Sequence, residues 1–181
     1  MREALLRFAS EISAAHEGLS LARRNRRYLA VLPDGGMPGP YCENLGHVVA
    51  EVDTSGSIGP PEIALFLGTL EEILRAFPAI RLTVVAAADR LHEVTEIPAG
   101  APELPSPLPL SGHGDTDFRP AIGWAESELE APPSLLVYLT DGWGLAPEAP
   151  PSFPMLWALE RPEGNRTPAS WGETAYLYPR G

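Results

Sequence analysis

Short apolar runs alternate with helical patterns along the chain from Gly46 onward, and this alternation limits the possible folds more than any other feature. In residues 60–77, a proline near the start, apolar residues at helical spacing and Pro78 behind them predict a helix. A second helix is expected over residues 117–130. Predicted strands occupy residues 47–52, 82–88, 91–97, 134–140, 155–159 and 174–178. Strands that alternate with helices favour an α/β fold with a mostly parallel sheet covered on both faces.

The segments outside this pattern suggest how the chain is divided. Apolar residues recur at helical spacing in residues 2–22, which predicts an amphipathic N-terminal helix. Residues 33–40 are rich in Pro and Gly and continue neither a helix nor a strand. We therefore expect a lead-in segment over residues 1–40 and one domain over residues 41–181. Residues 98–115 are polar and rich in proline, and we expect them to form a loop outside the core.

Composition and charge exclude several classes of protein. The 181 residues include 44% hydrophobic side chains, enough for a core, and carry a formal net charge of -11. Such a chain is not expected to bind nucleic acid or an anionic membrane, because phosphate binding needs clustered Lys and Arg. The basic cluster at residues 23–27 is interpreted as solvated or paired with carboxylates, since no recognition pattern follows it.

Cysteine use and hydropathy bear on the compartment. The single cysteine, Cys42, rules out an intrachain disulfide framework. No apolar run reaches the roughly 20 residues that a bilayer span requires. The first residues carry acids and lack the apolar block of a signal peptide. We therefore expect a cytoplasmic protein.

Three loops carry side chains suited to a small divalent cation. Asp53, Ser55 and Ser57 follow the first predicted strand, Thr116 precedes the second helix, and Asp141 follows the strand at residues 134–140. Loops that leave the carboxyl ends of strands in an open α/β sheet gather at one edge. Carboxylates and hydroxyls are hard oxygen donors, which Mg²⁺ prefers. Taken alone, the loop at residues 53–57 is also typical of a helix cap.

Together these motifs resemble the metal-ion-dependent adhesion site of von Willebrand factor type A (VWA) domains. The similarity extends over about residues 26–178 and is specific only when the motifs are taken jointly. More narrowly, the chain resembles the VWA-like domain at the C-terminus of bacterial predicted metallopeptidase-like proteins. The stretches that carry this resemblance are Arg26-Arg27-Tyr28, Gly-x-Gly-x-Thr-Asp-Phe-Arg-Pro ending at Pro120, and Leu139-Thr140-Asp141-Gly142 followed by Pro154-Met155-Leu156-Trp157.

The resemblance implies a fold, a cofactor and a kind of partner. It implies a Rossmann-like VWA fold that binds Mg²⁺ or Mn²⁺ and, through the cation, an acidic residue of a protein partner. The implied metal-site residues are Asp53, Ser55, Ser57, Thr116 and Asp141. Bacterial members of this group often work with a MoxR-type AAA+ ATPase, so such an ATPase is the expected partner. The implied function is protein interaction without enzymatic activity.

Several residues near these motifs remain open to two interpretations. Asp115 is either a further metal ligand or a charge that disfavours an acidic partner group. Asp117 either caps its helix or orients the ligands. Trp143 either anchors a partner or packs within its loop.

Two rival functions use the same edge. One is a Mg²⁺-assisted phosphohydrolase, with Arg119 as the basic residue near the motifs and Asp115 as a possible base. The other is a scaffold whose metal site is inactive. Protease activity is rejected, because the near match to H-E-x-x-H at residues 92–96 ends in Glu and falls on a predicted strand.

Overall fold

The computed structural model describes residues 46–160 and 167–177, which form one mixed α/β layer structure. The helices are α2 (Pro60–Ala76) and α3 (Arg119–Ser127). The strands are β1 (His47–Asp53), β2 (Arg81–Ala87), β3 (Leu91–Ile97), β4 (Leu135–Thr140), β5 (Met155–Leu159) and β6 (Glu173–Tyr176). The six predicted strands are confirmed, with bounds that differ by at most two residues from the apolar runs.

The strands form one sheet in the order β3-β2-β1-β4-β5-β6. All neighbours run parallel except β2 and β3, which form an antiparallel hairpin. After β1, the chain adds β2 and β3 on one side of it, and then β4, β5 and β6 on the other side. The adjacent strands β1 and β4 therefore mark the switch point of the sheet. In sheets of this kind, ligands bind beyond the carboxyl ends of the strands at the switch point.

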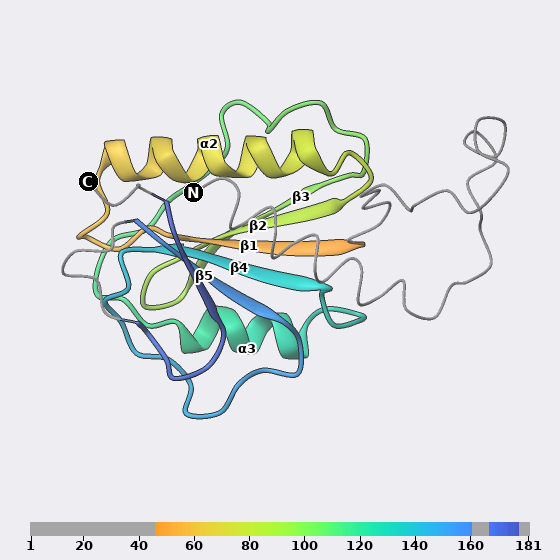
Figure 1. Ribbon diagram of the computed structural model, residues 1–181. Coiled ribbons are helices and arrows are strands. Elements are labelled where there is room, and N and C mark those ends of the chain that lie inside the picture. Colours follow the sequence, from red (N-terminus) through yellow and green to blue (C-terminus); the bar gives the residue numbers. More distant parts are fainter. Residues whose placement is uncertain (1–45, 161–166, 178–181) are drawn as a thin grey trace, which may run out of the picture.

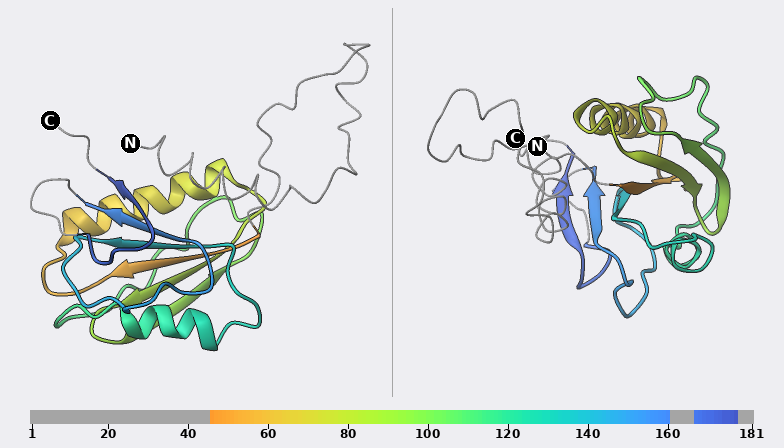
Figure 2. Two further views of the ribbon diagram at one scale, coloured as in Figure 1. Left: turned by 60° about the horizontal axis from the view of Figure 1, so that its bottom comes forward. Right: turned by 90° about the vertical axis from the view of Figure 1, so that its right-hand side faces the viewer.

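Alternate side chains of the sheet enter two separate cores. Figures 1 and 2 show α2 on one face of the sheet and α3 on the other. On the α2 side, Val48, Ala50 and Val52 of β1 pack with Phe66 and Leu70 of the helix. On the α3 side, the core contains a cluster of aromatic rings from Phe118, Tyr138 and Trp157, with centroids 4.8–5.5 Å apart. The expectation that both faces of the sheet are covered is confirmed.

The ends of α2 follow from its sequence. Pro60 takes the first helical position, where its missing N–H is not needed. The carboxylate of Glu62 accepts a hydrogen bond from the backbone N–H of Gly59 at 3.0 Å, which satisfies a donor at the start of the helix. The helix ends directly before Phe77 and Pro78. Its first residue is therefore held five positions after Ser55, close to the carboxyl end of β1.

Two expectations need correction. The second helix spans Arg119–Ser127 rather than residues 117–130. Acidic Glu128 and Glu130 at its end are unfavourable for the helix dipole, and the prolines that follow cannot continue it. Residues 98–115 do not stay outside the core.

That loop contributes apolar cover to the α2 side of the sheet. Leu104, Leu108 and Leu110 are partly buried and pack against the core there. The leucines alternate with exposed prolines and polar residues, so the loop is both irregular and packed.

The predicted N-terminal helix, the basic cluster and Cys42 lie outside the described residues. Neither described helix combines the length and apolar character that a membrane span requires.

Candidate cation site at the carboxyl edge of the sheet

Asp53 is the last residue of β1 and is completely buried. One carboxylate oxygen, Oδ1, accepts a hydrogen bond from the backbone N–H of Ser55 at 2.9 Å. The other, Oδ2, accepts the hydroxyl of Thr140 on the adjacent strand β4 at 2.6 Å. The carboxylate is therefore fixed in position by donors from two strands.

The two serines of the same loop bring their hydroxyls together. Ser55 Oγ and Ser57 Oγ are 3.3 Å apart, the first buried and the second exposed. Neighbouring oxygens in an octahedral Mg²⁺ shell lie about 3 Å apart, since each is about 2.1 Å from the ion. The spacing of the hydroxyls fits two ligands of one small cation.

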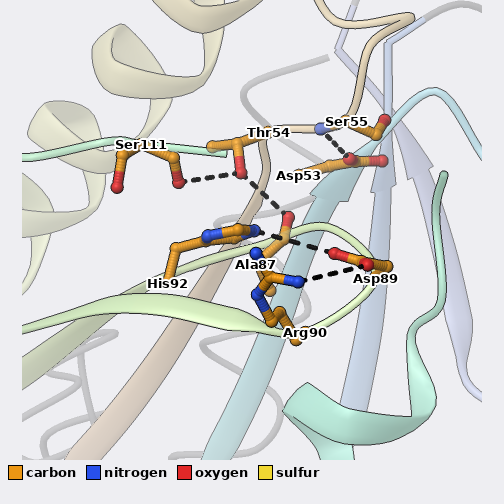
Figure 3. A network of polar contacts seen from close by, with 8 residues as sticks. All are labelled: Asp53, Thr54, Ser55, Ala87, Asp89, Arg90, His92 and Ser111. Carbon is orange, nitrogen blue, oxygen red and sulfur yellow. Dashed lines mark hydrogen bonds and ion pairs between the residues drawn. The ribbon is translucent and has the colours of Figure 1, made fainter. Parts of the chain in front are cut away.

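The loop is attached to the neighbouring strand β2. The backbone N–H of Thr54 donates to the carbonyl of Ala87 at 2.9 Å. The Thr54 hydroxyl lies 3.1 Å from the same carbonyl and 3.3 Å from the carbonyl of Ser111 (Figure 3). Figure 3 also shows Asp89 and His92 of the β2–β3 hairpin below this loop, with Asp89 Oδ1 3.9 Å from His92 Nε2. The loop after β1 therefore rests on the hairpin.

The second loop, at residues 112–116, joins the first directly. The backbone N–H of Gly56 donates to the carbonyl of Gly114 at 3.1 Å, and Asp117 N–H donates to Ala88 at 2.9 Å. Thr116 lies beside the third loop, which contains Gly144. A Cβ added to Gly144 would be 2.8 Å from Cγ2 of Thr116. Thr116 is therefore held between the loops that carry Asp53 and Asp141.

The third loop follows β4 and is bent by Gly142. Gly142 has a φ of 90°, which favours glycine, and its N–H donates to the Thr140 hydroxyl at 3.1 Å. Asp141 Oδ1 accepts the N–H of Trp143 at 3.0 Å. Further along, the carbonyl of Leu145 accepts the N–H of Phe118 at 2.9 Å. The third loop is thus bonded to Phe118, just after the second loop, and the first loop is bonded to the end of β4 through Asp53 and Thr140.

The electrostatics of the site are those of an uncompensated acidic group. Burial raises the pKa of Asp53, the hydrogen bonds from Thr140 and Ser55 oppose the shift, and the charge of Asp141 raises the pKa further. Asp53 ends β1 and Asp141 directly follows β4, the adjacent parallel strand. A bound cation would offset both the burial and the repulsion.

The residues present fit a small, hard cation. They provide two carboxylates and three hydroxyls, all on loops at the switch point. Residues 46–160 and 167–177 contain no group of three or more His, Cys, Asp or Glu arranged for a metal. Hydroxyl groups therefore supply most of the oxygen donors at this site. Such a set of ligands suits Mg²⁺ or Mn²⁺ better than zinc.

Asp115, Asp117 and Trp143 are the residues for which the sequence allowed two interpretations. Asp115 and Trp143 are exposed on the second and third loops. Asp117 is not the N-cap of α3, which is Phe118. Its Oδ1 accepts the backbone N–H of Arg119 at 3.0 Å, and its carboxylate is paired with the Arg119 guanidinium at 2.6–3.1 Å. The side-chain hydrogen bonds from Arg119 lower the pKa of Asp117, and the backbone hydrogen bond and the charge of Arg119 lower it further.

Two residues important for the geometry were not predicted. Thr140 orients the Asp53 carboxylate, and Thr54 fastens its loop to β2 and to Ser111. Thr140 is the last residue of β4. Because Val52 pairs with Leu139, the parallel register of β1 and β4 places Thr140 opposite Asp53. This register is a signal for Thr140 only when the strand order is known.

Comparison with known proteins agrees with this architecture. Residues 48–178 match the VWA-like domain (DUF2201). An uncharacterized protein of Thermotoga maritima is 32% identical over 120 residues, which are 66% of this chain and 27% of the Thermotoga protein. The chain therefore aligns with about a quarter of that relative. No solved structure matches the chain. From the sheet order, the converging loops and the match over residues 48–178, the chain belongs to the VWA-like domain family.

Proposed function

We propose that this domain is a cation-dependent protein-interaction module. VWA-like domains are in general protein-interaction modules, and the described edge offers a specific way to bind a partner. In this proposal Asp53, Ser55, Ser57, Thr116 and Asp141 hold Mg²⁺ or Mn²⁺. The observation that carries it is the convergence of three loops around a buried carboxylate, with two serine hydroxyls 3.3 Å apart.

The protein's own residues would prepare the site before any cation arrives. Thr140 and the Ser55 N–H hold both oxygens of Asp53, so its carboxylate cannot rotate freely. The loop at residues 112–116 positions Thr116 through the Gly56–Gly114 bond. When bound, the cation would supply a positive centre for a carboxylate of the partner.

The proposed partner is a MoxR-type AAA+ ATPase, which presents an Asp or Glu to the site. This choice is supported by the resemblance to bacterial VWA-like domains that work with such ATPases. Such a partner would place the interaction in the cytoplasm, where ATP is available.

A Mg²⁺-assisted phosphohydrolase is supported less well by the geometry. Such an enzyme needs a cationic group for the phosphate, and along the sequence Arg119 is the basic residue nearest the motifs. Its guanidinium is paired with Asp117 at 2.6 Å. A panel of phosphate esters and nucleotides with Mg²⁺ should therefore show no turnover above background.

Calorimetric titration with Mg²⁺ and Mn²⁺ tests the cation site. The wild-type chain should bind one equivalent, and Asp53→Ala should abolish binding while circular dichroism shows an intact fold. Glu130→Gln is the matched control, because it removes an exposed acid between α3 and the start of β4, at the opposite edge. Equal affinity in Asp53→Ala and wild type would contradict the assignment. No binding by wild type would favour a scaffold with an inactive site.

Capture of the ATPase tests the partner. A MoxR-type ATPase from the same operon or organism should bind the immobilised chain in Mg²⁺ and elute with EDTA. The Asp53→Ala chain should capture none. Capture that persists in EDTA would show that the cation is not needed.

A further inference from the structure

The loop that carries Asp141 also presents a pair of exposed apolar side chains. Among the residues that the structure describes, the large hydrophobic side chains left exposed are Val94, Trp143 and Leu145, at 44%, 55% and 60%. Trp143 and Leu145 are neighbours on the third loop, whereas Val94 lies on the edge strand β3. We call Trp143 and Leu145 the apolar pair. Aromatic residues are enriched at protein interfaces relative to the rest of the surface, so the apolar pair is a candidate partner-binding surface.

The backbone under the apolar pair is fixed. The N–H of Trp143 is bonded to Asp141 Oδ1 at 3.0 Å, and the carbonyl of Leu145 accepts the N–H of Phe118 at 2.9 Å. Between them, Gly144 packs so closely that an added Cβ would lie 2.6 Å from Phe118 Cζ. The exposure of both side chains is therefore built into a held loop, and a partner would meet them already in place.

The apolar pair lies within reach of any group bound at the cation site. Two residues of chain span at most about 7 Å, so Trp143 begins no farther than that from Asp141. Its hydrogen bond to Asp141 means that the loop turns back toward the ligand residue. A peptide with a carboxylate at the site would therefore bring its neighbouring side chains near Trp143.

Charge explains why an acidic partner would need this second contact. The chain has a net charge of -11, and Asp115 and Asp141 lie at this edge. A single divalent cation offsets only part of the repulsion that an acidic segment meets there. The free energy gained by burying apolar surface does not depend on that repulsion. Tryptophan is among the residues that most often contribute strongly to the binding energy of protein interfaces.

We propose that the partner segment is bipartite: an Asp or Glu for the cation and, within three residues of it, a large apolar side chain that packs on Trp143 and Leu145. This inference rests on the proposed function, because the carboxylate contact requires the cation. It adds a specificity element that the cation site alone does not supply.

A peptide-display selection tests the proposal. Random 12-residue peptides with one fixed central Asp are selected on the full chain in Mg²⁺ and eluted with EDTA. The eluted peptides should be enriched in Phe, Trp, Leu, Ile or Met within three positions of the Asp. Eluted peptides with no such enrichment, or no EDTA-eluted peptides from a chain that binds Mg²⁺, would overturn the proposal.

Variants then locate the contact on the most enriched peptide. Trp143→Ala and Leu145→Ala should each weaken peptide binding at least tenfold, with Mg²⁺ affinity unchanged by calorimetry. Val94→Ala is the matched control, because it removes an exposed apolar side chain from β3, and it should bind the peptide like wild type. Peptide addition should also shift tryptophan emission to shorter wavelength in wild type and not in Trp143→Ala.

The outcomes separate the two proposals. Peptide that binds Trp143→Ala and Leu145→Ala as tightly as wild type, and still elutes with EDTA, overturns the bipartite segment and leaves the cation-dependent interaction standing. Failure of wild type to bind Mg²⁺ overturns both.

Discussion

Glu51 is the described residue whose burial is least offset by hydrogen bonds. It lies in the middle of β1, is fully buried, and neither of its carboxylate oxygens has a hydrogen-bond partner among the described residues. Its neighbour in the sheet register is Tyr138, whose hydroxyl is in the same condition. Burial raises the pKa of Glu51 well above its ordinary value of 4.5. The folded state therefore holds a proton that the unfolded state releases.

The direction of the shift fixes how stability depends on pH. Below about pH 4.5 both states of the protein bear the proton, and Glu51 imposes no ionisation penalty. Above that pH the unfolded chain ionises first, so stability falls by about 1.4 kcal/mol per pH unit until the folded pKa is passed. Glu51→Gln should remove this slope, which urea unfolding between pH 4 and 8 measures. Glu130→Gln should retain the wild-type slope, and an unchanged slope in Glu51→Gln would contradict the assignment.

Thr140 controls the Asp53 carboxylate. Its hydroxyl donates to Asp53 Oδ2 at 2.6 Å and accepts from Gly142 N–H, so it joins two of the three loops. Thr140→Val should lower the free energy of unfolding by about 1–3 kcal/mol, because a buried carboxylate loses its donor. It should weaken Mg²⁺ binding about 10- to 100-fold, as loss of an orienting bond commonly does. Thr140→Ser should restore both, and recovery in neither assay would refute this role.

At the scale of elements, the parts predicted from sequence are those whose pattern is local. The strands appear as apolar runs because both faces of the sheet are covered, and β5 was predicted with its observed bounds. The end of α3 was misplaced, because its apolar spacing continues to Leu129 while the backbone stops at Ser127. Apolar periodicity does not report where helix hydrogen bonds cease.

The site shows the same division between local and distant information. The sequence predicted Asp53, Ser55 and Ser57 because they form one local motif. It predicted Asp141 because this residue directly follows an apolar run typical of a strand. The bond from Thr140 to Asp53 joins residues 87 positions apart, and nothing in either local sequence specifies it. The packing of the loop at residues 98–111 on the α2 side was missed for a similar reason. Its leucines are separated by prolines and match no periodic template.

That loop is expected to contribute measurably to stability. Leu108 and Leu110 are each partly buried against the α2-side core, which corresponds to about 1 kcal/mol per side chain. The double variant Leu108→Ser, Leu110→Ser should therefore lose about 2 kcal/mol in urea unfolding. Glu103→Ser changes an exposed residue of the same loop and should lose little. Equal effects of the two changes would mean that the leucines add nothing beyond loop composition.

At the scale of the whole molecule, the strand order and the net charge act on the same edge. The switch between β1 and β4 brings Asp53 and Asp141 together, and their repulsion is part of the folded state's free energy. A chain with a net charge of -11 adds a general repulsion to this local one. A cation that binds the folded edge should relieve both, and its effect should appear as a change in global stability.

Thermal unfolding with and without Mg²⁺ measures this coupling. A cation present at about 100 times its dissociation constant stabilises the folded state by about 2.7 kcal/mol, which raises the midpoint by several degrees in a domain of this size. Because protons compete for Asp53, whose pKa is raised, the Mg²⁺ effect should be larger at pH 8 than at pH 5. Asp53→Asn should abolish the Mg²⁺ effect, since it removes the negative charge at the centre of the site while keeping the size of the side chain. NaCl at matched ionic strength separates specific binding from screening of the net charge. If NaCl stabilises wild type as much as Mg²⁺ does, the stabilisation is general screening and the edge holds no specific cation.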